Sequence, residues 1–107
     1  MPLTVVGLPS LVIPNNGSTS NAIGILDDSF GITLYTPATL TGTITVEVEP
    51  TDTGTNFVTL QSGGVDVTLP AGKGTVINPI PFRQMRLTSN AAEGGTRTTV
   101  VTKSILL

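Results

Sequence analysis

Hydrophobic and polar positions alternate most clearly along residues 43–69, TITVEVEPTDTGTNFVTLQSGGVDVTL. Ile44, Val46 and Val48 alternate with Thr and Glu, which is typical of a strand with one buried and one exposed face. Turn formers then separate this strand from two further runs of strand-forming residues, and Gly63-Gly64 lies between those two runs. The pattern predicts a three-stranded meander over residues 43–49, 57–60 and 65–69.

Strand-like runs also cover the rest of the chain. Residues 82–88 predict a strand with Met85 and Leu87 on its buried face, and residues 96–107 predict a final strand. Two further runs are separated by the turn formers of residues 27–31, so we expect them to pair as a hairpin. The remaining expected strands are at residues 3–6, 11–13, 22–26, 31–35 and 75–77.

These elements define the fold class. Turn signals recur about every 8 to 12 residues, and no segment has helical periodicity. We therefore expect an all-β protein: a single antiparallel β-sandwich, jelly-roll-like, with about eight or nine short strands and no significant helix. The chain has 107 residues, which suits one core better than two.

The first residues form a distinct segment, MPLTVVGLPSLVIPNN, in which prolines interrupt an apolar run. Proline excludes a continuous helix and favours extended pieces or an edge strand. We expect residues 1–16 to be an N-terminal extended arm or edge strand and residues 17–107 to be the β-sandwich domain. The segment either packs on its own domain or lies on a neighbouring subunit.

Charge and composition exclude several classes of function. The net charge is −2 and the five basic residues are scattered, so we expect no nucleic-acid binding. No run approaches the roughly 20 apolar residues of a spanning helix, so we expect a soluble protein that does not enter a membrane. The start of the chain lacks the basic residues of a signal peptide, and we expect no cleaved leader. Without cysteine there is no disulfide framework.

Catalytic and metal-binding residues are scarce. The chain has no His and no Cys, which removes the usual general base, catalytic nucleophile and zinc ligands. Glu47 and Glu49 lie on one face of their expected strand, but we interpret them as solvated acids of a polar face. Asp27 and Asp28 are adjacent, yet the further ligands of a calcium loop are not visible. We expect no enzyme activity, no cofactor and no bound metal.

The low charge itself suggests an interaction surface. Exposed sheet edges are commonly protected by charged side chains, and this chain has few of them. We therefore expect a partner to cover one edge, with the domain acting as a subunit of a larger assembly. The candidate surface residues come from the apolar N-terminal segment and from both sides of the loop near residue 30: Leu3, Val5, Leu11, Ile13, Phe30 and Tyr35.

Four motifs between residues 46 and 89 resemble those of small β-sandwich proteins from the virions of tailed bacteriophages. They are VEVEP at residues 46–50, DTGTNFVTL at 52–60, VTLPAGK at 67–73 and PIPFRQMRL at 79–87. The chain departs from the pattern at Thr53-Gly54, where Asp-Gly is expected, and at Phe57, where Trp is frequent. The match covers about two fifths of the chain and consists of turn and strand motifs.

The resemblance implies a capsid decoration or cement protein. Such a protein binds between major capsid subunits on the outer surface of the virion and reinforces the shell, and it is made in the host cytoplasm. Its expected partners are the major capsid protein and further copies of itself, as a dimer or trimer. The alternative is a carbohydrate- or receptor-binding β-sandwich module of a phage fibre or tail, with Phe30 and Tyr35 as a small aromatic platform.

Overall fold

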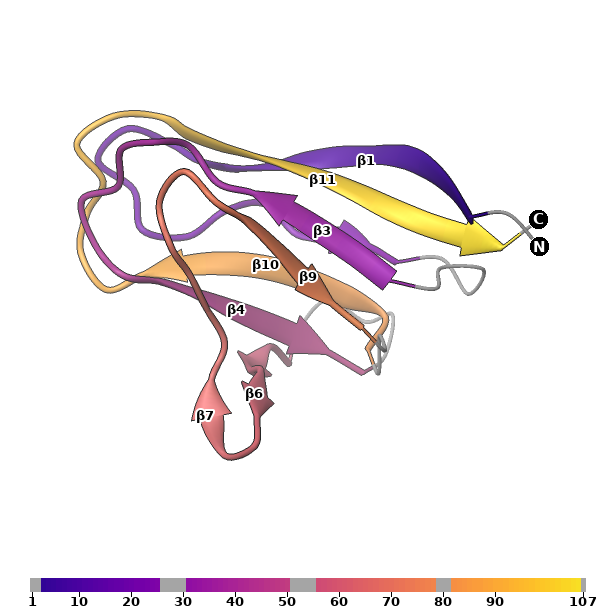
Figure 1. Ribbon diagram of the computed structural model, residues 1–107. Helices are drawn as coiled ribbons and strands as arrows, with labels where there is room; N and C mark the ends of the chain where they lie inside the picture. Colours follow the sequence, from indigo (N-terminus) through magenta and orange to yellow (C-terminus); the bar gives the residue numbers. More distant parts are fainter. Residues whose placement is uncertain (1–2, 26–30, 51–55, 79–81, 107) are drawn as a thin grey trace.

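The computed structural model describes residues 3–25, 31–50, 56–78 and 82–106. None of these residues is helical, and apart from one two-stranded hairpin the strands form two antiparallel sheets that face each other (Figure 1). The molecule is thus an all-β sandwich, as the sequence predicts. The strands are β1 (Leu3–Ile13), β2 (Ile23–Gly24), β3 (Gly31–Tyr35), β4 (Ile44–Glu49), β5 (Val58–Thr59), β6 (Gln61–Ser62), β7 (Val65–Asp66), β8 (Thr68–Leu69), β9 (Gly74–Ile77), β10 (Gln84–Ser89) and β11 (Arg97–Leu106).

The chain crosses repeatedly from one sheet to the other. Sheet 1 has the order β1-β11-β3-β9, and sheet 2 has the order β2-β10-β4-β5, with β8 also pairing to β4. The expected hairpin between residues 22–26 and 31–35 is therefore wrong, because β2 pairs with β10 in sheet 2 and β3 pairs with β11 and β9 in sheet 1. Local turn signals do not determine which sheet each strand joins.

One apolar core fills the space between the sheets. Met85 and Leu87 of β10 are fully buried, which confirms the predicted inner face of this strand. Sheet 1 contributes inward side chains from all four of its strands. The buried apolar residues are Leu11, Ile13, Ile23, Ile25, Ile32, Leu34, Ile44, Val46, Val48, Leu69, Ile77, Phe82, Met85, Leu87 and Val101.

The N-terminal segment is a single edge strand of sheet 1. β1 pairs with β11 from Leu3 to Ile13, and the register shifts between Leu8 and Leu11. Pro9 lies within this shift. The regular hydrogen bonding between the strands is interrupted there, so a residue without an N–H group is tolerated. The strand thus continues past the proline instead of ending there.

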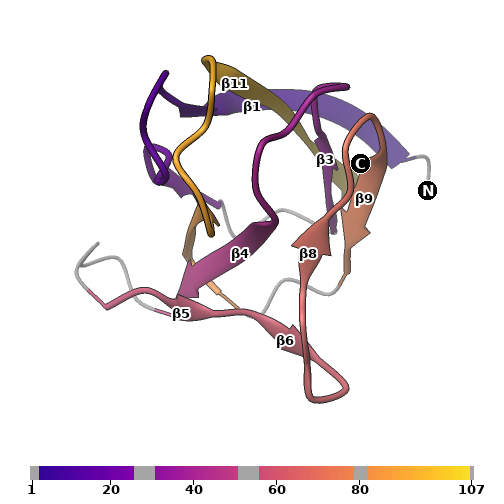
Figure 2. The same cartoon turned by 90° about the vertical axis from the view of Figure 1, so that its left-hand side faces the viewer.

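The expected meander contains an extra hairpin. β5 and β8 pair with successive parts of the same edge of β4, and the chain between them leaves sheet 2 as the β6–β7 hairpin (Figures 1 and 2). Gly63 and Gly64 at its turn have φ values of 62° and 80°. Two positive φ values are what a tight hairpin turn of this type requires, so the predicted turn lies where expected.

Candidate functional site

The outer face of sheet 1 is the main candidate for a binding surface. Cross-strand partners lie side by side on one face of a sheet. Leu34 and Val101 are partners and are both buried, so they define the inner face. The neighbouring pair Thr33 and Thr102 therefore faces outward, and Val76 of β9 continues the row beside Thr33.

This outer face carries no charged side chain along the described strands. The four strands contain only two charged residues, Arg97 and Lys103. Arg97 is the partner of Ile13 and Lys103 is the partner of Ile32, and both isoleucines are 1% exposed. Both cationic side chains consequently belong to the inner face, so none of the described outer-face side chains of these strands is charged.

Exposed apolar side chains are concentrated on this outer face. The exposed fractions are 66% for Val5, 47% for Tyr35, 68% for Val76 and 49% for Val100. Val100 and Tyr35 are direct partners on adjacent strands. We call the outer face of sheet 1, with these four residues, the uncharged face.

Tyr35 lies across the edge of the uncharged face. Its partner on β9 is Gly74, and a Cβ atom at Gly74 would come within 3.3 Å of two ring carbons of Tyr35. The absence of a side chain at Gly74 thus lets the ring lie over the backbone of the edge strand. The ring presents a fixed, largely apolar surface with one hydroxyl group.

Sheet 2 differs in chemistry on its outer face. Glu47 and Arg86 are cross-strand partners, and the Glu47 carboxylate lies 2.7 Å from Arg86 Nε. The Arg86 guanidinium also lies 4.3 Å from the centre of the Phe57 ring. Charged and polar groups of this kind keep an outer face hydrated, so the two faces of the sandwich are chemically distinct.

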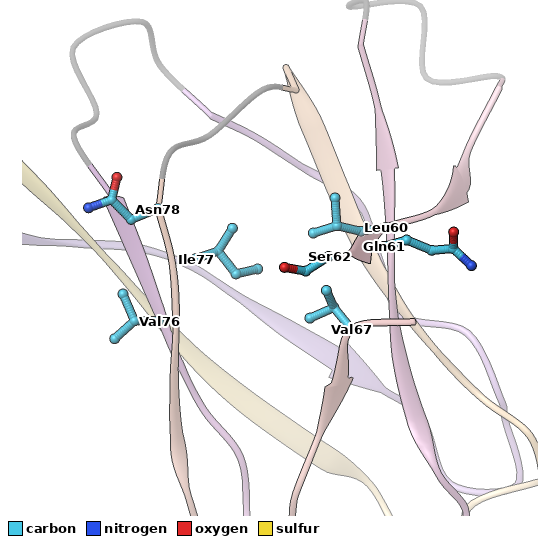
Figure 3. A pocket seen from close by; sticks show the side chains of 7 residues that line it. All are labelled: Leu60, Gln61, Ser62, Val67, Val76, Ile77 and Asn78. Carbon is cyan, nitrogen blue, oxygen red and sulfur yellow. The ribbon is translucent and has the colours of Figure 1, made fainter. Parts of the chain in front are cut away.

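A hollow lies between the β9 edge and the β6–β7 hairpin (Figure 3). Leu60, Val67 and Ile77 face one another across it, and its volume is about 380 Å³. None of the described lining residues is ionisable or aromatic, so they supply neither acid–base chemistry nor a stacking platform for a sugar ring. The lining is Leu60, Gln61, Ser62, Val67, Val76, Ile77 and Asn78.

Glu93 is a buried carboxylate with a structural role. Its two oxygens accept hydrogen bonds from the amides of Thr41 and Gly42 at 2.8 and 2.9 Å. Ser89 Oγ and Arg97 Nε donate further bonds at 2.8 and 3.0 Å. These contacts join the segment before β4 to the segment between β10 and β11.

The environment of Glu93 shifts its pKa. Burial by itself raises the pKa of a carboxyl group, because it disfavours the charged form. The hydrogen bonds from the Thr41 and Gly42 amides, Ser89 and Arg97 favour the charged form and lower the pKa from 4.5 to about 2. The group is therefore ionised at neutral pH and holds the loops together.

Glu47, Glu49 and Glu93 are less exposed to solvent than the sequence predicts. Glu49 and Glu93 are both 0% exposed, and Glu47 is only partly exposed because it contacts Arg86. The interpretation of the Glu47 and Glu49 pair as solvated is therefore wrong for Glu49. Asp27 and Asp28 lie outside the described residues, and within the described parts of the chain no three acidic residues come together as metal ligands.

The candidate surface residues fall into three groups. Val5 and Tyr35 lie on the uncharged face, as a binding surface requires. Leu11 and Ile13 need correction, because both are fully buried in the core and are not available to a partner. The side chain of Leu3 and the whole of Phe30 lie outside the described residues.

Sequence reasoning missed Val76 and Val100. Both occur in short Thr-Val runs. The only signal for their exposure was the alternation of inward and outward side chains along a strand. Val100 and Val101 are adjacent, so one of them must face outward, but their sequence does not say which. The buried partner Leu34 assigns Val101 to the inside and thereby Val100 to the outside.

Comparison of the chain with protein-family models, with curated proteins and with solved structures gives no match. Within the described residues, no helix is long and apolar enough to cross a bilayer. The class that the fold defines is a small antiparallel β-sandwich protein.

Proposed function

We propose that this chain is a structural virion protein that decorates and reinforces a phage capsid by binding between major capsid subunits. The observation that carries the proposal is the uncharged face, on which Val5, Tyr35, Val76 and Val100 are exposed together. The virion would be its location, and the major capsid protein and further copies of the chain would be its partners.

The chemistry of the uncharged face fits protein binding. Interface centres are depleted of charged residues, because a buried charge loses its hydration. β-branched and aromatic side chains on a sheet have few rotamers, so ordering them on binding costs little entropy. A sheet surface of Val, Thr and Tyr thus suits a flat docking site on a protein shell.

The strand order supports the same class of protein. β1, β3, β9 and β11 form one sheet, while β2, β4 and β10, which lie between them in sequence, belong to the other. We interpret this order as that of a jelly roll, an architecture that occurs in viral capsid and lectin domains. The motifs that resemble phage virion proteins include β4, β8 and β10 of sheet 2, so they describe the scaffold on the side opposite the proposed docking face.

Co-sedimentation with capsids that lack the protein tests this proposal. A gene for a major capsid protein beside the gene for this chain would supply the appropriate target capsids. We expect the wild-type protein to sediment with them and Val100→Glu to lose binding at least tenfold. Val65→Glu, on the exposed β6–β7 hairpin, is the matched control and should bind as the wild type.

Two outcomes would overturn the proposal. The wild-type protein could fail to bind the capsids, or Val100→Glu and Val65→Glu could bind equally well. Binding to a glycan array instead of to capsids would favour the carbohydrate- or receptor-binding alternative. The hollow of Figure 3 offers that alternative Gln61, Ser62 and Asn78 as polar groups, but no aromatic ring among the described lining residues.

A further inference from the structure

The two sheets have edges of very different length. β1 is an edge strand of 11 residues, whereas β9 at the opposite edge of sheet 1 has four. The edge strands of sheet 2, β2 and β5, have two residues each. β1 is therefore the only described edge long enough to pair with another strand over several residues.

The C-terminal half of the β1 edge is blocked by the chain itself. The Asn21 side chain accepts a hydrogen bond from the Val12 amide at 2.8 Å and donates one to the Ser10 carbonyl at 3.1 Å. Pro9 lies next to these residues at the register shift and has no N–H group to donate. Both features are ways in which proteins prevent a further strand from adding to an edge.

The N-terminal half of the same edge has none of these protections. Residues 3–8, LTVVGL, contain no charge and no proline, and they pair only with β11 among the described strands. Val5 is 66% exposed and Val6 is 37% exposed. An edge of this composition exposes backbone donors and acceptors to a further strand.

We propose that residues 3–8 of β1 pair antiparallel with the same residues of a second copy of this chain. Antiparallel pairing of two identical edges places a two-fold axis perpendicular to the sheet, and one residue lies opposite itself on that axis. A charged residue there would meet its own like charge, whereas Val5 or Val6 meets another valine. The sequence of this edge is thus suited to itself as a partner.

The geometry of this dimer extends the uncharged face. A two-fold axis perpendicular to the sheet keeps the outer faces of both copies on the same side. Sheet 1 of each copy has four strands, so the pairing makes one continuous sheet of twice that number. The inference does not depend on capsid binding, because it follows from the edge of β1 alone.

Sedimentation velocity across concentrations tests the pairing. With Val5 or Val6 on the axis, five residues of each copy pair within residues 3–8. They bury less area than a standard interface of about 1,600 Å², so we expect the dimer to dissociate on dilution. A range from roughly 1 µM to roughly 1 mM covers such affinities. We expect Val5→Lys to raise the dissociation constant at least roughly tenfold, because it places a charge within the paired edge of each copy.

Val65→Lys is the matched control for this measurement. It makes the same change at a valine that is 69% exposed, on the β6–β7 hairpin away from β1, and should leave dimerisation unchanged. Far-UV circular dichroism of both variants checks that the fold persists. A wild-type chain that stays monomeric up to roughly 1 mM would overturn the proposal, as would equal effects of the two substitutions.

Cross-linking gives an independent test, because the natural chain has no cysteine. Residues directly opposite each other in antiparallel strands have Cα atoms about 4.5 to 5.5 Å apart, which is within the range for a disulfide. We expect Val5→Cys or Val6→Cys, whichever lies on the axis, to give a disulfide-linked dimer under mild oxidation. Val65→Cys should not. Failure of both β1 variants, or equal linking of all three, would overturn the proposed register.

Discussion

The Glu93 carboxylate and the Arg97 guanidinium form a 3.0 Å ion pair in which the carboxylate is completely buried. The same carboxylate accepts backbone hydrogen bonds from Thr41 and Gly42, which precede β4. One side chain thus joins the start of the central strand of sheet 2 to the loop that leads into β11 of sheet 1.

Replacing Glu93 by Gln should strongly destabilise the fold. The amide keeps the shape, but it loses the charge that Arg97 pairs with and turns an N–H₂ group toward one of the two backbone amide donors. We expect a loss of about 3 kcal/mol in the free energy of unfolding, measured by urea titration. Glu47→Gln, at the more exposed pair with Arg86, should cost less than about 1 kcal/mol. Equal losses in the two variants would contradict the assigned role of Glu93.

The depressed pKa of Glu93 predicts acid sensitivity. The pKa is about 2 in the folded protein against an ordinary value of 4.5, so the unfolded chain takes up this proton first as the pH falls. The stabilisation is complete above pH 4.5 and is lost between pH 4.5 and pH 2. We expect a decrease of about 3 kcal/mol from this group across that range.

Urea titrations between pH 7 and pH 2 measure this decrease. Glu93→Gln has no carboxyl group at this position, so its stability should depend less on pH below 4.5 than that of the wild type. The difference between the two curves isolates Glu93 from the other acids. Parallel curves for both proteins would show that the pKa of Glu93 is not depressed.

Gly42 is predicted to tolerate no side chain. A Cβ atom there would lie 2.6 Å from Asn90 Oδ1 and 3.0 Å from the Ala91 nitrogen, and it would also overlap Ser89 Oγ. Because Ser89 donates to Glu93, the clash disturbs the same hydrogen-bond network. We expect Gly42→Ala to lower the free energy of unfolding by about 2 kcal/mol or more.

Gly24→Ala is the control for Gly42→Ala. It adds the same methyl group in β2, where a Cβ atom meets no heavy atom within 4 Å. We expect a change within about 0.5 kcal/mol or a slight gain in stability. If both variants unfold at the same urea concentration, a lack of space for a side chain at Gly42 does not explain the glycine there.

The turn of the β6–β7 hairpin depends on backbone conformation. Gly64 has a φ of 80°, and a β-branched residue is strained in this region. We expect Gly64→Val to open the hairpin with a local cost of about 1 to 2 kcal/mol, visible as faster amide exchange in β6 and β7. Gly63→Asn should be tolerated, because Asn adopts positive φ readily and Asn-Gly suits this turn. Similar exchange rates in both variants would argue against a strained turn.

Features that depend on neighbouring residues in the chain could be predicted from the sequence. The alternation in β4 and β10, the buried Met85 and Leu87, and the turn at Gly63 and Gly64 follow from side-chain period and backbone preference. The absence of helical periodicity determined the all-β class in the same way. These properties are local, so the sequence contains them directly.

Only the tertiary structure decided where the strands lie and what their side chains meet. β2 and β3 are close in sequence but belong to different sheets, and burial of Leu11 and Ile13 follows from the place of β1 beside β11. Glu93 is buried and ionised because the distant segment at Thr41 and Gly42 packs against it and donates two hydrogen bonds. The uncharged face arises from the register of four strands that are not consecutive. Strand pairing and register are set by the burial of apolar side chains from the whole chain, so no local sequence pattern specifies them.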